Sequence, residues 1–320
     1  MKGKYRIVVS NNKLNYTLEI ERNITVISGN SGTGKTTLVS LLESYQKYGS
    51  QSGVSVQCQR PCVVIDSLYW ESNIQNTHNS IVFIDEGNSF VETREFADLI
   101  KSTDNYYVLI TRESLPQLPY SVSSILEMKK TTSRFKKTYN RTYPYYDNLP
   151  ESFQNNSAEL VVTEDSKSGF QMYGHICKKY SKKCISANGK SNITNILQKC
   201  KNHSVLVIAD GAAFGPEIEK IYIKMQEPAS KVSLYLPESF EWIILKSGIV
   251  SYRNLDDILD NPSEYIECAE YFSWEKYFTE LLQKITQDTE LQYNKNMLSG
   301  AYFSEKNVDK IIAVMIKNSY

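Results

Sequence analysis

Residues Gly29-Asn30-Ser31-Gly32-Thr33-Gly34-Lys35-Thr36 decide the fold of the N-terminal half of this chain. The string fits the pattern GxxxxGK[ST] at every position. The apolar stretch ITVIS directly before it is typical of a strand. After Lys35, leucines recur at the spacing of an amphipathic helix, at Leu38, Leu41 and Leu42. The sequence therefore predicts a strand, a glycine-rich turn and a helix in direct succession.

A turn of this composition is suited to wrapping a polyphosphate. Its glycines allow backbone N–H groups to point inward and to approach the ligand closely, and the following helix directs its positive end at the same place. We expect residues Gly29 to Thr37 to bind a nucleoside triphosphate. Lys35 would bridge the β and γ phosphates, and the Thr36 hydroxyl would be a ligand of Mg²⁺.

An acidic pair follows a second buried strand. Ile81-Val82-Phe83-Ile84 is a run of four apolar residues that ends in Asp85-Glu86. We expect Asp85 to hold the magnesium ion or one of its waters, and Glu86 to act as a general base on the attacking water. Taken alone, the pair would favour the alternative, an acidic strand end that caps a helix.

A third apolar strand, Tyr106 to Ile110, ends in Thr111-Arg112. A polar residue at such a position can sense the γ-phosphate, and both Thr111 and Arg112 are candidates. A plain surface arginine remains the alternative for Arg112.

With these three motifs, residues 1–125 resemble a compact P-loop ATPase of the AAA-like or RecA-like type. The resemblance implies an α/β fold with a parallel sheet covered by helices on both faces, and it implies ATP and Mg²⁺ as cofactors. No base-reading motif such as NKxD is present, so ATP is preferred without excluding GTP.

The sequence predicts a second α/β domain after a polar linker. We place the first domain at residues 1–148, the linker at 149–157, the second domain at 158–250 and a helical segment at 251–320. In the second domain one strand ends in Glu164-Asp165, and another is followed by the string DGAAFG that begins at Asp210.

This pattern resembles the Toprim domain of topoisomerases, primases and overcoming-lysogenization-defect nucleases. Glu164 matches the family's glutamate, Asp210 the first aspartate and Gly215 the glycine, but Ala212 stands where the second aspartate belongs. The resemblance implies a second Mg²⁺ site at Glu164 and Asp210, with Asp165 or Glu238 as replacement ligands. A metal nuclease, an inactive docking domain and a generic Rossmann-like domain all remain open. An ATPase joined to such a domain resembles the ATPase-nucleases of bacterial mobile elements and phage defence.

A basic, aromatic-rich segment at residues 127–146 is expected to form a hairpin. It carries six basic residues interleaved with tyrosines: Lys129, Lys130, Arg134, Lys136, Lys137 and Arg141. Such a hairpin could bind nucleic acid through residues 129–141, or it could be a solvated strand face whose tyrosines pack on the domain. The C-terminal aromatics, among them Trp274 and Phe278, are typical of a core, and they would also suit a protein partner or a second copy of the chain.

The composition limits the classes of protein that remain possible. The chain has 320 residues and a formal net charge of zero, and its six cysteines form no CxxC pair. We therefore expect a cytoplasmic protein with reduced thiols, no signal peptide and no membrane span. Two functions follow: an ATP-hydrolysing enzyme whose nucleotide cycle controls the Toprim-like domain, or a nucleotide-dependent binding or assembly protein in which that domain only docks a partner.

Overall fold

The computed structural model describes residues 1–132, 137–147, 149 and 158–317. The chain divides into two compact units. The first consists of Met1–Asp147 and Ser263–Ser273, and the second of Asn148–Pro262 and Trp274–Tyr320. The sequence did not predict that residues 263–273 belong to the first unit. Of the predicted linker at 149–157, only Leu149 lies within the described residues.

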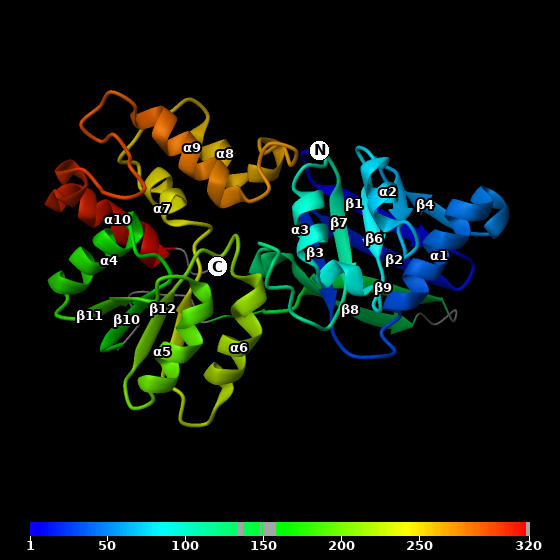
Figure 1. Cartoon of the computed structure of the whole chain (residues 1–320), viewed down its shortest axis with the longest axis horizontal. Helices are drawn as coiled ribbons and strands as arrows, with labels where there is room; N and C mark the ends of the chain where they lie inside the picture. The colour runs from blue at the N-terminus through cyan, green and yellow to red at the C-terminus, as the bar shows by residue number, and fades with distance from the viewer. Residues whose placement is uncertain (133–136, 148, 150–157, 318–320) are drawn as a thin grey trace. The chain divides into compact units, whose positions relative to one another are not determined.

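The first unit contains a nine-stranded sheet in the order β4-β1-β2-β9-β8-β3-β7-β6-β5 (Figure 1). Its strands are β1 (Tyr5–Ser10), β2 (Leu14–Ile20), β3 (Ile24–Ser28), β4 (Ser55–Gln57), β5 (Cys62–Val64), β6 (Ile81–Ile84), β7 (Tyr106–Ile110), β8 (Ile125–Thr132) and β9 (Thr138–Pro144). Its helices are α1 (Lys35–Tyr48), α2 (Trp70–Gln75) and α3 (Arg94–Ile100). The predicted α/β class is confirmed for this unit.

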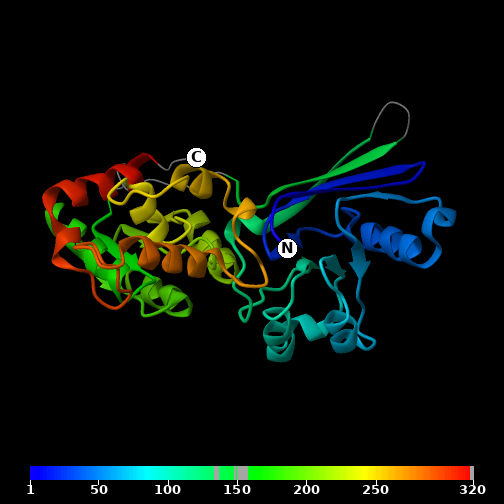
Figure 2. The same cartoon turned by 90° about the horizontal axis from the view of Figure 1, so that it is seen from above.

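The sheet is mixed, whereas the sequence predicted a parallel one. Strands β5, β6, β7, β3 and β8 are parallel neighbours. Strand β8 then turns back into β9 as the predicted hairpin, and β9 pairs in parallel with β2. Figure 2 shows β1 and β2 (blue) running beside β8 and β9 (green). The pairing of β9 with β2 joins segments more than a hundred residues apart, so no local pattern could predict it.

Strand β7 shows why the central strands are almost continuously apolar. The Tyr106 ring packs against Tyr5 at 5.6 Å between centroids, while the Tyr107 ring packs against Phe96 of α3 at 6.1 Å. Successive side chains of a strand point to opposite faces, so both faces of the sheet are covered at this point.

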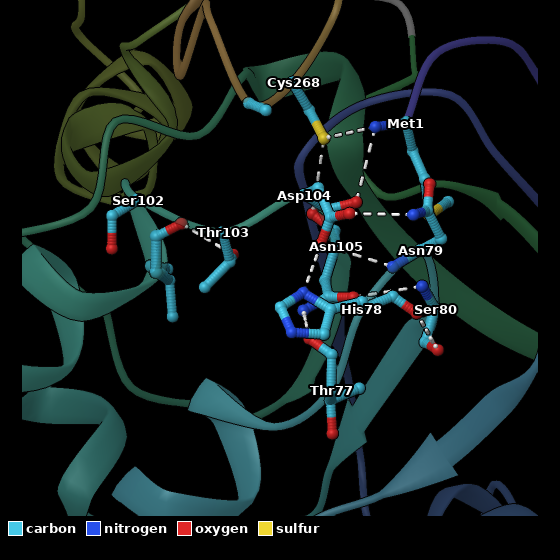
Figure 3. Close-up of polar contacts among 12 residues, drawn as sticks. Met1, Thr77, His78, Asn79, Ser80, Ser102, Thr103, Asp104, Asn105 and Cys268 are labelled. Atoms are coloured by element: carbon cyan, nitrogen blue, oxygen red, sulfur yellow. Dashed lines mark hydrogen bonds and ion pairs between the residues drawn. The ribbon is translucent and has the colours of Figure 1, made fainter.

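The segment 263–273 is held to the first unit by backbone and side-chain hydrogen bonds. The Cys268 N–H donates to the carbonyl of Met1 at 2.9 Å, and the buried Asn23 amide donates to the carbonyls of Cys268 and Tyr271 at 3.3 and 3.2 Å. Figure 3 shows the Cys268 thiol beside Met1 and above Asp104, whose carboxylate accepts from Asn79. The segment is therefore an integral part of the first unit.

The second unit contains a four-stranded parallel sheet in the order β11-β10-β12-β13. Its strands are β10 (Leu160–Thr163), β11 (Lys183–Ser186), β12 (Val205–Ile208) and β13 (Val232–Tyr235). Its helices are α4 (Ser168–Lys179), α5 (Ile193–Lys199), α6 (Gly215–Gln226), α7 (Phe240–Lys246), α8 (Leu255–Asp260), α9 (Trp274–Thr286) and α10 (Glu305–Lys317). Within this unit, the carboxyl ends of β10 and β12 are neighbours, which brings the residues after them together.

Candidate functional site

The glycine-rich loop lies between β3 and α1. Three of its glycines have positive φ angles: 111° at Gly29, 78° at Gly32 and 96° at Gly34. At Gly34 a side chain is excluded twice, because a Cβ there would also lie 2.9 Å from the Tyr16 hydroxyl. The loop conformation therefore depends on these glycines, as the sequence pattern predicted.

The Lys35 side chain folds back into the loop. Its Nζ donates to the carbonyls of Gly29 and Asn30 at 2.6 and 2.9 Å and to the Thr33 hydroxyl at 3.3 Å. Burial lowers the pKa of Lys35, the charge of Arg112 lowers it further, and the carboxylates of Glu86 and Asp85 oppose both effects. The amine thus lies at the centre of the loop, within electrostatic reach of all three groups.

Strand β7 lies between β3 and β6, and its pairing aligns the ends of all three strands. Ile27 pairs with Ile110, and Ile84 pairs with Leu109. The loop and Asp85 therefore emerge at the same edge of the sheet. The Asp85 Oδ1 atom is buried and has no hydrogen-bond partner among the described residues, so it is available to a ligand.

Of the two candidates after β7, Arg112 is the one that contacts the loop. Its Nη2 donates to the Ser31 hydroxyl at 2.7 Å, and its Nε lies 3.1 Å from Oε1 of Glu86. The Thr111 hydroxyl instead accepts the Glu113 N–H at 3.0 Å within its own turn. Thr36 is exposed in the first turn of α1, as is Thr37, whose hydroxyl bonds with that of Tyr16.

Three residues near the loop were not predicted. Tyr16 donates to the Gly34 carbonyl at 3.1 Å, Lys130 donates to the Gly32 carbonyl at 3.2 Å, and Asn140 lies beside Gly34. They come from β2, β8 and β9, and of these three strands β8 pairs directly with β3, the strand that leads into the loop. The strict alternation of side chains along the predicted hairpin was the one signal that could have separated Lys130 from Lys129.

The outer face of the hairpin is of mixed charge. Lys129 lies opposite Arg141, forms an ion pair with Glu127 at 2.6 Å and lies 5.4 Å from the Tyr143 ring centroid. A groove of about 500 Å³ beside it is lined by Arg141 and by Lys4, Arg6, Glu19 and Tyr143, among other residues. Two of the basic residues predicted for a nucleic-acid surface, Arg134 and Lys136, lie outside the described residues.

In the second unit, carboxylates gather around a cavity of about 300 Å³. Glu164 and Asp210 lie in its wall, and Oε2 of Glu164 accepts the Asp210 N–H at 3.2 Å. Burial raises the pKa of Glu164 to about 7, and burial together with the neighbouring carboxylates raises the pKa of Asp210. The negative charges of the two groups repel each other, and a bound proton relieves this repulsion.

The acids that accompany this pair differ from the predicted replacements. Asp165 lines the cavity, but its carboxylate accepts the N–H groups of Lys167 and Gly169 at 2.9 and 2.6 Å. Glu238 is not among the residues that line the cavity. Glu241 and Glu275 do line the cavity, and both lie far along the chain from the expected motif.

Both of these glutamates have a polar partner in the same unit. Glu241, which is 2% exposed, accepts the Tyr293 hydroxyl at 2.7 Å, and Glu275 pairs with Lys295 at 2.7 Å. Within the described residues, no three His, Cys, Asp or Glu side chains lie close enough together to hold a metal ion. The cavity therefore offers two carboxylates, Glu164 and Asp210, rather than a complete set of metal ligands.

Comparisons with known proteins did not assign the chain to a family. No model of a known protein family matches the chain, and no curated protein matches it. In the part of the chain that the structure describes, every helix is too short or too polar to cross a membrane.

Proposed function

We propose that the first unit binds ATP with Mg²⁺ and hydrolyses it. The observation that carries this proposal is the position of Lys35 and the bare Asp85 oxygen at one edge of the sheet, on either side of the end of β7. A buried lysine inside a glycine-rich loop and a buried carboxylate oxygen at the same edge of the sheet suit the phosphates and the metal of a nucleotide.

The residues at this site would have the following roles. The loop N–H groups and Lys35 bind the β and γ phosphates, where the positive end of α1 adds to the attraction. The Thr36 hydroxyl and Asp85 would hold the magnesium ion, which takes few protein ligands and retains water and phosphate oxygens. Bound there, the metal neutralises negative charge on the phosphates.

Glu86 distinguishes hydrolysis from simple binding. Its carboxylate lies at the same strand end as Asp85 and is paired with Arg112. A γ-phosphate near Ser31 offers Arg112 a stronger anion, which would release Glu86 to accept a proton from the attacking water. The pair therefore gives a physical route by which substrate binding prepares the base.

Steady-state phosphate release tests this proposal against the nucleotide-dependent binding protein. We expect Glu86→Gln to keep ATP affinity and to lose turnover by at least about a hundredfold. Exposed Glu92→Gln in the same unit is the matched control and should retain turnover. Absence of phosphate release from wild type at saturating ATP would favour the binding protein.

A second proposal concerns the cavity of the second unit. We propose that Glu164 and Asp210 bind a divalent cation that acts on a phosphodiester, as the Toprim resemblance implies. The raised pKa values of both groups support this proposal, because a cation relieves the same crowding of negative charge that a proton does. Two carboxylates completed by water and a substrate phosphate are an ordinary set of ligands for Mg²⁺.

A nuclease assay with Mg²⁺ or Mn²⁺ tests this second site. We expect Glu164→Ala and Asp210→Ala each to abolish cleavage of DNA or RNA, and Glu290→Gln, an exposed glutamate of the same unit, to leave it unchanged. Cleavage that survives both alanine substitutions would assign the activity elsewhere. Control of this unit by the nucleotide cycle predicts that ATP changes the cleavage rate in wild type but not in Lys35→Ala.

A further inference from the structure

Three side chains from three strands form one row beside the phosphate loop. Tyr16 on β2 pairs with Asn140 on β9, and Asn140 pairs with Lys130 on β8. Residues that are direct partners across neighbouring strands point to the same face of a sheet. Tyr16, Asn140 and Lys130 therefore lie side by side, although 114 residues separate the first from the third in sequence.

All three members of the row face the loop. The Tyr16 hydroxyl donates to the Gly34 carbonyl at 3.1 Å, and Lys130 Nζ donates to the Gly32 carbonyl at 3.2 Å. The Asn140 Oδ1 atom lies 3.6 Å from the position that a Cβ on Gly34 would occupy. Strands β2, β8 and β9 thus each place a side chain beside the loop.

Asn140 has an unusual hydrogen-bonding state. Its side chain is 3% exposed, and its Nδ2 has no acceptor among the described residues. Buried amide donors nearly always have an acceptor, so this one indicates an oxygen that arrives from elsewhere. A phosphate oxygen bound beside the loop would supply such an acceptor.

The positive charge of Lys130 is bound only weakly by the loop. Its acceptor is a neutral carbonyl, and a phosphate oxygen would bind the same ammonium more strongly. Lys129, the preceding residue, points to the opposite face and pairs with Glu127. Lys130 and Lys129 are therefore adjacent on one strand, but Lys130 points toward the loop and Lys129 points away from it.

We propose that Lys130 is a second phosphate-binding cation of the nucleotide site, and that Asn140 positions the loop at Gly34. The proposal rests on the proposed ATP site and extends it to the β8–β9 hairpin. Its ligand is the polyphosphate chain, not the base. The hairpin thereby becomes part of the site, and its two faces have separate roles.

The affinities of Mg·ATP and Mg·GTP for a set of variants test the role of Lys130. We expect Lys130→Ala to weaken both nucleotides by roughly tenfold, which is the loss of one charge-assisted hydrogen bond. Lys130→Arg should restore most of the affinity because it keeps the charge. Lys129→Ala should change affinity by less than about twofold, since its ion pair is exposed.

The outcomes separate this inference from the proposed function. Loss of binding in Lys35→Ala together with equal affinities of Lys130→Ala and Lys129→Ala would overturn the inference alone. Wild-type affinity in Lys35→Ala would overturn the proposed function as well. A change in the ratio of ATP to GTP affinity in Lys130→Ala would contradict a contact with phosphate.

The test of Asn140 needs a measurement whose result would not change if Asn140 only stabilised the fold. Asn140→Asp replaces the amide by a carboxylate of the same size. Beside phosphates it should weaken Mg·ATP more than Asn140→Ala does, and added salt should narrow the difference because it screens repulsion. Equal ATP affinities of the two variants at low salt would overturn the role of Asn140 beside the loop.

Discussion

Nε of Arg112 lies 3.1 Å from Oε1 of Glu86, while another nitrogen of the same guanidinium binds the Ser31 hydroxyl of the glycine-rich loop. The side chain proposed as general base is therefore held by a cation that also contacts the proposed phosphate site. Under the proposed function, Arg112 would restrain Glu86 before nucleotide binds and stabilise the phosphates afterwards.

The first prediction concerns that shared cation. Arg112→Ala should lower ATP turnover by about a hundredfold, as expected when one charged donor is removed from a developing anion. Arg112→Lys should recover only part of this loss, because lysine cannot bind two partners in the planar geometry of arginine. Phosphate release at saturating ATP measures both, and the exposed Arg94→Ala is the control. Wild-type turnover in Arg112→Ala would show that Arg112 is a plain surface arginine.

The second prediction concerns the contact between Gly34 and Tyr16. Gly34→Ala should destabilise the first unit by about 1–3 kcal/mol, because it adds strain at φ 96° to a clash with the Tyr16 hydroxyl. Tyr16→Phe removes that hydroxyl and should recover part of the loss in the double variant. Gly32→Ala, where nothing lies within 4 Å, reports the backbone strain alone. Urea unfolding of the four variants measures these terms, and equal stabilities of Gly34→Ala and Gly32→Ala would rule out the clash.

The sequence predicts those parts of the fold that local patterns determine. The apolar runs of β3, β6 and β7 are buried on both faces and could be read directly, as could the glycine turn before α1. The hairpin predicted at residues 127–146 from its polar, aromatic-rich composition is also confirmed, because β8 and β9 pair antiparallel. These features depend on neighbouring residues only, so one sequence suffices.

The parts that the sequence could not predict all depend on distant pairings. Lys130 reaches the loop because β8 pairs with β3, and Glu241 and Glu275 line the cavity because of how their helices pack in the second unit. The return of residues 263–273 to the first unit depends on Asn23 and Met1. Hydrophobic periodicity carries no information on which segments meet.

The third prediction concerns the pH dependence of the second unit. The pKa of Glu164 is raised from its ordinary 4.5 to about 7, so between these values the folded state keeps a proton that the unfolded chain has lost. Stability therefore falls as pH rises through this window and levels off above it. Glu164→Gln should flatten the dependence. Urea midpoints from pH 4.5 to 8 measure it, with Trp242 and Trp274 as reporters in a Trp70→Phe background.

A matched variant gives this experiment its control. Glu290 is exposed in the same unit, so Glu290→Gln should keep the wild-type slope. Identical slopes for wild type and Glu164→Gln would contradict the environment assigned to Glu164. Added Mg²⁺ should stabilise wild type more at pH 8 than at pH 5, because protons and cations compete for the same carboxylates.

The fourth prediction concerns the segment 263–273. Asn23→Ala removes the amide that binds the carbonyls of Cys268 and Tyr271, and it should lower stability by about 1–3 kcal/mol. The loss should be local at first, so amide exchange in residues 263–273 should rise before exchange in β3 or β7 does. Unchanged exchange in the segment would show that other contacts suffice to hold it.

The most direct test of the account is the binding of labelled ATP, in the presence of Mg²⁺, to wild type and to Lys35→Ala. Lys35 is buried at the centre of the loop and lies within electrostatic reach of Asp85 and Glu86. We predict saturable binding by wild type and a loss of at least about a hundredfold in Lys35→Ala, because the loop would lose its buried charge. Equal affinities of the two proteins, or no binding by either at millimolar ATP, would contradict the assignment of this loop as a nucleotide site.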